Sequence, residues 1–192
     1  MKISWLFAGM LFLAGCGGNA SEGDVTGKNP ETVDGFAITK IEGTSLQKAE
    51  KLDADGQVSE SGLLARGERN GTWTKFYPGG ARPSVMASYI DGKYNGPYLE
   101  FDENGQITLR AFYADNLLEG YWGKYQFGQL TFEATYKGGK LDGKYKEFRG
   151  DGGLSKEISY KDGLLEGPYR FFDDAGNIVL EYTYRKGEKV GN

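Results

Sequence analysis

Residues 160–169 of this chain read Tyr-Lys-Asp-Gly-Leu-Leu-Glu-Gly-Pro-Tyr, and the chain repeats this stretch. The same pattern, a tyrosine followed by two glycines and a second aromatic residue, recurs at residues 89–98 and 136–145. At residues 113–122 Asn116 takes the place of the first glycine, a replacement that a left-handed turn accepts. The recurrence predicts tandem copies of one short structural unit, and this decides the fold.

Two sets of residues recur in step along the chain with a period of about 24 residues. The register tyrosines are Tyr89, Tyr113, Tyr136, Tyr160 and Tyr184. The register glycines are Gly71, Gly96, Gly120, Gly143 and Gly167. A further set of glycines keeps the same spacing, and members such as Gly105 and Gly152 follow Asn or Asp, in pairs that tolerate the positive φ that closes a β-hairpin. We therefore expect each unit to be a hairpin whose tyrosine belongs to a buried core.

The segment that ends at each register tyrosine alternates between apolar and polar residues. Phe132, Ala134 and Tyr136 fall on one face of such a segment. Acidic residues occupy equivalent positions on the opposite face: Glu133, Glu157 and Glu181. This period of two predicts a strand that is buried on one side. The preceding strand carries two aromatic residues three apart, such as Tyr98 and Phe101, so either a bulge brings them together or the sheet has aromatic residues on both faces.

These units resemble the MORN repeat, in the variant found in YwqK-like antitoxin components. The resemblance covers about residues 54–192 and implies an all-β fold, an elongated antiparallel β-meander of tandem hairpins with eleven or twelve strands. Before Gly71 the pattern decays, with Leu64 in the tyrosine register. We expect residues 36–70 to form a degenerate N-terminal cap repeat and residues 71–192 to form an array of about five repeats.

Residues 1–15 resemble the signal peptide of a bacterial lipoprotein. The apolar run from Ile3 to Leu13 is too short to span a bilayer as a helix. It ends in Leu13-Ala14-Gly15-Cys16, which resembles a lipobox, where cleavage precedes the cysteine and the thiol carries a diacylglycerol. This predicts lipidation of Cys16 and anchoring to a membrane through the acyl chains. Residues 16–35 lack periodicity and predict a flexible tether.

The sequence also predicts the compartment of the protein. A lipobox implies export and attachment to the bacterial cell envelope. Aspartate after the lipidated cysteine commonly signals retention in the inner membrane of Gram-negative bacteria, and here that position is Gly17. Glycine therefore favours the outer membrane if the source is Gram-negative.

Composition argues against several function classes. The net charge of −4 argues against nucleic-acid partners, which need basic surfaces. The chain has no histidine and a single cysteine, which excludes Ser-His-Asp and Cys-His catalysis and the usual zinc sites. Acidic residues in turns, such as those of 53–56 and 102–105, are expected to cap the turns rather than to hold calcium or to catalyse hydrolysis. We expect no cofactor, no metal and no enzymatic activity.

The array is expected to be a protein-binding module in the cell envelope, because repeat arrays present extended surfaces to partners. The candidate contacts lie on the first strand of each unit, the one that precedes the strand with the register tyrosine. They occupy equivalent places in five successive repeats: Lys75, Glu100, Lys124, Glu147 and Phe171. The alternative is that these positions serve cross-strand ion pairs. In that case the second-strand glutamates would pair with first-strand basic residues, namely Lys75, Lys124, Lys146 and Arg170.

Two other functions are compatible with the same residues. The resemblance to antitoxin components implies an immunity protein that neutralises a toxin acting in the envelope. A purely structural envelope lipoprotein would use the same anchor and repeats without a dedicated ligand.

Overall fold

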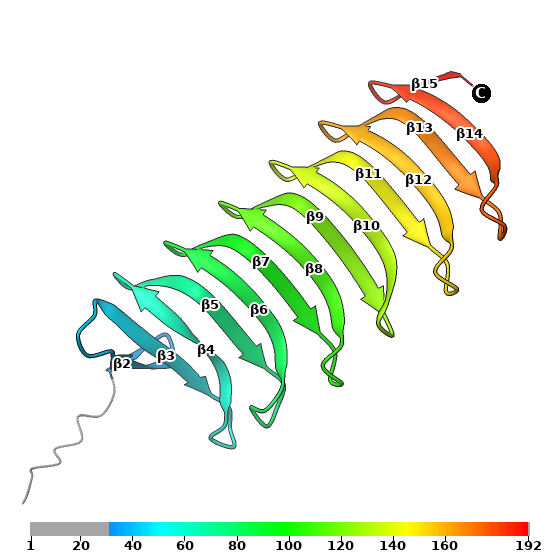
Figure 1. The fold of residues 1–192 in the computed structure, drawn as a ribbon. Coiled ribbons are helices and arrows are strands. Elements are labelled where there is room, and N and C mark those ends of the chain that lie inside the picture. Colours follow the sequence, from blue (N-terminus) through cyan, green and yellow to red (C-terminus); the bar gives the residue numbers. More distant parts are fainter. Residues whose placement is uncertain (1–30, 192) are drawn as a thin grey trace, which may run out of the picture.

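The computed structural model describes residues 31–191, and these form one antiparallel β-sheet of fifteen strands (Figure 1). Every strand pairs with the next one along the chain, so the sheet is a simple meander. The strands are β1 (Glu31–Val33), β2 (Phe36–Lys40), β3 (Leu46–Leu52), β4 (Val58–Ala65), β5 (Glu68–Phe76), β6 (Pro83–Ile90), β7 (Lys93–Phe101), β8 (Ile107–Ala114), β9 (Leu117–Gln126), β10 (Gln129–Lys137), β11 (Lys140–Phe148), β12 (Leu154–Lys161), β13 (Leu164–Phe172), β14 (Ile178–Arg185) and β15 (Glu188–Gly191). The predicted all-β meander is thus confirmed.

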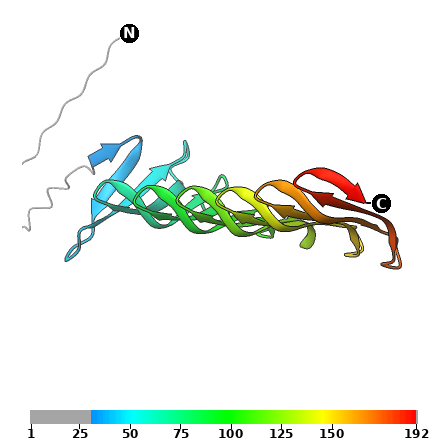
Figure 2. The same ribbon diagram turned by 90° about the horizontal axis from the view of Figure 1, so that it is seen from above.

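The array is long, narrow and one layer of strands thick, and it twists along its length (Figure 2). The stretch that resembles the repeat, residues 54–192, holds twelve strands, β4–β15, as predicted, and the sheet has three further strands before it, β1–β3. The predicted tether also ends too late, since Glu31–Val33 pairs with β2 as β1. Within residues 31–191 no helix is long and apolar enough to cross a membrane. The predicted signal peptide, Cys16 and the rest of the predicted tether lie outside the described residues.

Two kinds of turn join the strands, and they alternate from β4 to β9 and again from β10 to β15. The first kind has two residues, both with positive φ, as in Asp91-Gly92 at 47° and 77°. Such type I′ turns match the twist of the strands that they join. Asp115-Asn116 has the same geometry at 48° and 69°, so the predicted replacement of glycine by Asn116 is confirmed.

Three of the longer turns are closed in the same way by an aspartate side chain, that of Asp53, Asp102 or Asp173. The carboxylate of Asp102 accepts backbone N–H groups from Asn104 and Gln106, each at 2.9 Å. Asp173 repeats this arrangement with Ala175 at 3.0 Å and Asn177 at 2.8 Å. These acids cap turns, as their sequence context predicted.

The register glycines lie where the register of each hairpin shifts. Between Ala134–Tyr145 and Tyr136–Leu141, β11 contributes two more residues than β10, and Gly143 lies in that bulge. Its φ is 125°, a region that L-residues rarely adopt, and a Cβ there would lie 3.0 Å from the Cβ of Thr135. Glycine is required at this position by both the backbone angle and the space.

Aromatic rings and alanines alternate across one side of the sheet, here called the aromatic face. Tyr98 pairs with Ala111, and Ala111 pairs with Trp122 on the next strand. Ala134 continues the row beside Trp122. Ala111 is completely buried and Ala134 is 2% exposed, because large rings on both neighbouring strands cover them. The core is therefore a single row of rings lying over small residues rather than a space between two layers.

The register tyrosines all lie on the aromatic face, but they are less buried than predicted. Only Tyr89 is buried, at 8% exposure, and the other four are half-buried. The rings of Tyr89, Tyr94 and Tyr113 form one chain, with neighbouring centroids 4.7 Å and 5.3 Å apart. Within residues 31–191 no second layer of structure covers these rings, which leaves one edge of each ring in solvent.

The second aromatic residue of each first strand lies on the other side of the sheet. Alternation along β7 places Tyr98 and Glu100 on the aromatic face and Phe101 on the opposite face. The register does shift between Glu100 and Phe101, so a bulge is present. Among the ring pairs of residues 31–191, however, none joins Phe101 to the tyrosines. The sheet therefore has aromatic residues on both faces, the second of the two alternatives left open by the sequence.

Candidate interaction surface

The five predicted contact residues lie in one straight row on the aromatic face. The row crosses the sheet at one level, with Lys75, Glu100, Lys124, Glu147 and Phe171 on alternate strands from β5 to β13. On the strands between them lie Val85, Leu109, Phe132 and Lys156. The structure thus brings the five residues together as neighbours in register. They flank the row of aromatic rings and share its face.

Most charges in this row are not joined to one another. Glu147 pairs with Lys156 at 2.6 Å, and its carboxylate also accepts a hydrogen bond from the Tyr145 hydroxyl at 3.2 Å. Burial, with the charge of Glu147 next to it, raises the pKa of Tyr145 to about 12. Lys75 and Lys124 are exposed, and neither has an ion pair among the described residues. The apolar residues on the intervening strands keep these charges apart.

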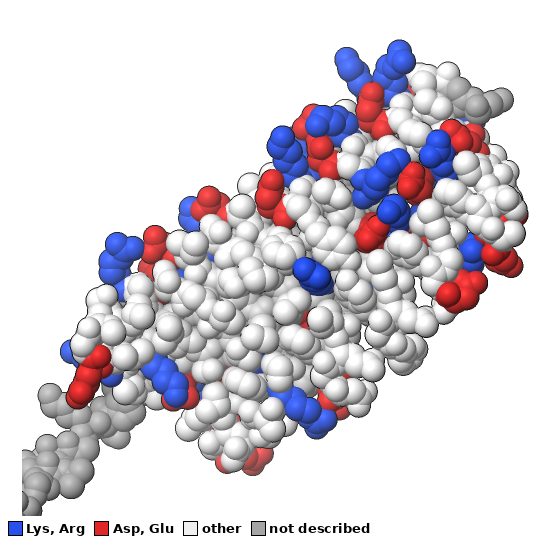
Figure 3. Space-filling model, viewed as in Figure 1, with Lys and Arg blue, Asp and Glu red and all other residues white. Residues whose placement is uncertain are grey.

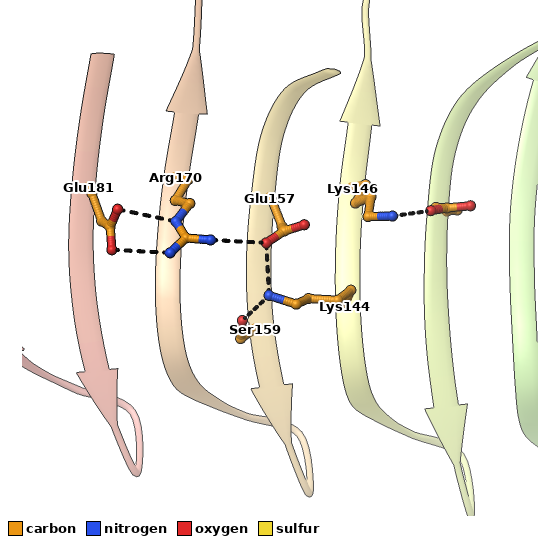
Figure 4. Close-up of polar contacts among 7 residues, drawn as sticks. Lys144, Lys146, Glu157, Ser159, Arg170 and Glu181 are labelled. Atoms are coloured by element: carbon orange, nitrogen blue, oxygen red, sulfur yellow. Dashed lines mark hydrogen bonds and ion pairs between the residues drawn. The ribbon is translucent and has the colours of Figure 1, made fainter. Parts of the chain in front are cut away.

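The predicted cross-strand ion pairs lie on the opposite side of the sheet, here called the ladder face. Glu133 pairs with Lys146 at 2.8 Å, and Arg170 bridges Glu157 at 3.7 Å and Glu181 at 3.1 Å (Figure 4). The prediction is therefore confirmed for Lys146 and Arg170. It is wrong for Lys75 and Lys124, whose side chains leave the sheet on the aromatic face and cannot reach these glutamates.

The ladder of charges covers only part of the molecule. In the view of Figure 3, charged side chains gather over the C-terminal strands, while the surface over the central strands is largely uncharged. The ladder residues themselves lie on β10–β14. Exposed ion pairs of this kind contribute about 0–1 kcal/mol each, so they matter more for register and solubility than for stability.

The N-terminal end of the aromatic face carries a group that the sequence did not reveal. Arg69 lies 4.0 Å from the ring centroid of Trp73 and pairs with Glu60 at 2.7 Å. Beside it is an open cavity of about 370 Å³, lined by Trp73, Phe36 and Leu64 among others. Leu64 occupies the position that tyrosine holds in later repeats, and the smaller side chain leaves this space. The break in the tyrosine register was the available signal for the cavity.

The described residues offer no metal centre. Within residues 31–191 no group of three or more His, Cys, Asp or Glu side chains is placed to hold a metal ion. The arrangement instead presents an extended face of half-buried rings flanked by separated charges.

Three segments of the chain match the model of the MORN repeat variant, at residues 94–115, 141–162 and 165–186. Each segment begins on a first strand and ends in the type I′ turn after a register tyrosine. These three parts of the array are similar to the MORN repeat variant. No match was found among the curated proteins.

The hairpin geometry explains the sequence of each matched segment. The second glycine provides the bulge, the tyrosine joins the row of rings, and the final turn residues provide positive φ. The segment from residue 116 to residue 140 is absent from the match, although it forms β9 and β10 in regular pairing.

Proposed function

We propose that this chain is a non-catalytic, membrane-anchored MORN-repeat lipoprotein that binds a protein partner in the cell envelope through its aromatic face. The observation that supports this most directly is a row of half-buried rings, flanked by separated charges and left uncovered along the array. Interfaces are enriched in tyrosine and tryptophan at their centres, with charges at their rim. Because the face is extended and nearly flat, it suits a macromolecule more than a small ligand.

The proposed anchor is a lipid on Cys16. A partner bound by a tethered array would be held close to the membrane, which is where an envelope protein meets its targets. Immunity against an envelope-acting toxin is one form that this function would take. A structural envelope protein is the alternative, and the experiments below separate it from a binding module.

Replacing Cys16 by serine removes the proposed attachment point of the acyl chains. We expect Cys16→Ser protein to lose incorporation of labelled fatty acid and to leave the mature membrane-bound fraction, since two or more acyl chains give stable anchoring. Metabolic labelling and fractionation measure both effects. Retention of the lipid label in this variant would exclude Cys16 as the anchor.

Reversing the charges of the contact row tests the binding face. We expect Lys75→Glu, Glu100→Lys, Lys124→Glu and Glu147→Lys together to reduce crosslinking to envelope proteins about tenfold or more, because interfaces reject like charges. Adding Lys156→Glu preserves the pair that Glu147 makes across the strands. Circular dichroism should show that the sheet remains folded.

A matched control lies on the ladder face. Exchanging Glu133 and Lys146 keeps their ion pair and the net charge, so it should leave crosslinking unchanged. Equal crosslinking by the row variant and the wild type would mean that the aromatic face is not the interface. If neither protein is crosslinked to any specific partner, the structural alternative is favoured.

A further inference from the structure

One unit in the middle of the array departs from the others in several places at once, all on the ladder face or at its edge. Where the second strands β6, β10, β12 and β14 have glutamate or methionine, β8 has Arg110, and where they have serine or threonine, it has Phe112. On β9, Tyr121 and Gly123 replace residues such as Lys144 and Lys146 of β11. In a repeat array, residues that only maintain the fold recur, so a local cluster of departures indicates a site with another role.

Arg110 is separated from the ladder of ion pairs. Its strand neighbours are Leu99 and Gly123, and the nearest acid in the same row, Glu133, lies one strand beyond Gly123. Arg110 is exposed, and its guanidinium makes neither an ion pair nor a hydrogen bond with any residue that the structure describes. It lies instead 5.5 Å from the ring centroid of Phe112 and 5.6 Å from that of Tyr121.

The glycine in this row explains the separation. The Tyr121 ring lies over Gly123 and occupies the space that a Cβ of residue 123 would need. There the Tyr121 hydroxyl hydrogen-bonds the Tyr125 hydroxyl at 2.8 Å. Tyr121 thereby screens Arg110 from Glu133 and holds a ring beside the guanidinium. The result is a fixed aromatic surface with one uncompensated positive charge.

The turn after β9 adds a protruding apolar side chain. Phe127 follows Tyr125 by two residues, forms a type I′ turn with Gly128 and is 85% exposed. Its φ is 52°, a backbone conformation that bulky residues rarely adopt and that Asn or Gly would adopt without strain. Neither backbone geometry nor burial therefore explains a phenylalanine here, whereas contact with a partner would.

We propose that Arg110, Phe112, Tyr121 and Phe127 form a second docking surface, which takes a protein segment presenting a carboxylate to Arg110 and an apolar hollow to Phe127. Arginine recognises carboxylates through paired hydrogen bonds, and the flanking rings keep the guanidinium accessible and oriented. Arginine and aromatic residues also dominate the energetic centres of protein interfaces. This surface lies on the face opposite to the contact row and is independent of the function proposed above.

A macromolecule fits this surface better than a small metabolite. The cavity at the N-terminal end and the smaller one beside Trp73 have none of the four side chains in their walls. A flat cluster that encloses nothing gains affinity only by burying area against another surface. Phe127 protrudes from the end of β9, as an anchor residue that inserts into a partner would.

The test uses the purified full chain, with a displayed library of random peptides as the probe. We expect selected peptides to be enriched in Asp and Glu, and Arg110→Glu to weaken their affinity about tenfold or more. Phe127→Asn should weaken it similarly, while the melting temperature stays equal or rises, because Asn-Gly is a favoured type I′ pair. Arg185→Glu and Lys186→Asn make the same changes at the C-terminal end and should leave affinity unchanged.

A merely structural role for these residues predicts a different pattern. Arg110→Glu and Phe127→Asn would then both lower the melting temperature. Their affinity for the selected peptides would equal that of the controls Arg185→Glu and Lys186→Asn. The proposal is overturned if selected peptides lack acidic enrichment, or if their affinity survives Arg110→Glu and Phe127→Asn. It is also overturned if the chain selects no peptide and binds only oligosaccharides bearing uronic acids, which share the carboxylate but not the protein segment.

Discussion

Trp73→Ala should destabilise the array by about 3–5 kcal/mol, the cost of removing a large buried aromatic side chain. Trp73 is 3% exposed, and its ring makes edge contacts with Phe36 and Tyr89 at centroid distances of 5.6 Å and 6.4 Å. The ring also lies directly against Gly62 of β4, and its Nε1 donates to the carbonyl of Leu63 at 2.9 Å. One residue thus contacts β2, β4 and β6 from β5, so its loss weakens the packing of the N-terminal strands against the rest of the array.

Urea unfolding measures this effect, with two variants as controls. Trp73→Phe keeps a ring but loses the hydrogen bond to Leu63, and we expect it to cost about 1–2 kcal/mol. Tyr184→Ala, near the other end, should cost less than half as much as Trp73→Ala, because Tyr184 is half-buried and its described ring contact is with Tyr169 alone. Equal costs for Trp73→Ala and Tyr184→Ala would contradict an array stabilised by nearest neighbours and indicate one shared core.

The repeat, the turns and the one-sided burial could be predicted because each depends on local sequence. Glycine and asparagine tolerate the positive φ that the two-residue turns need, and alternation along a strand fixes which residues share a face. The start of the sheet was not predicted, because its local sequence carries little signal. Glu31–Val33 has no apolar periodicity, and its only signal was the Asp34-Gly35 pair, which forms a type I′ turn at 51° and 81°.

Which residue each charge faces across the strands could not be predicted, because the partner depends on the bulges. At each register glycine, a bulge gives the first strand two additional residues. They lie between the residue that pairs with the register tyrosine and the residue that pairs with the alanine two positions before that tyrosine. Counting along the sequence without this insertion does not give the partner of Lys124, which pairs with Leu109 and Phe132 rather than with Glu133. The ion pairs of Lys146 and Arg170 were predicted correctly because both residues directly face a glutamate across the strands.

Alkaline pH should unfold the array cooperatively, because burial raises the pKa of many tyrosines together. The largest cause in each case is removal of the hydroxyl from water, and for Tyr89 and Tyr145 the pKa rises to about 12. The pKa is raised in the same direction, and for the same first reason, at Tyr98, Tyr113, Tyr121, Tyr136 and Tyr160. The native sheet therefore holds these seven hydroxyls in the neutral form at a pH where an unfolded chain would release their protons.

The sign of the effect follows from linkage. A tyrosine in an unfolded chain ionises near pH 10, so above about pH 10 the unfolded state binds fewer protons than the native state and stability falls as pH rises. The stabilisation is fully present below about pH 10 and is lost as the pH passes through the raised native values, toward 12 for Tyr89 and Tyr145. Because seven groups act in the same direction, the loss should be steep, and tyrosinate absorbance should rise together with the loss of sheet circular dichroism.

Tyr136→Phe provides a sharp control, because burial is the sole cause of the raised pKa of Tyr136 and its hydroxyl makes no hydrogen bond with any other described residue. The variant keeps the ring but cannot ionise, so its alkaline midpoint should move to higher pH while its stability at pH 7 stays nearly unchanged. If the tyrosines instead titrate gradually near pH 10 with the sheet intact, the rings are open to water. In that case the row of rings would not be the core that stabilises the array.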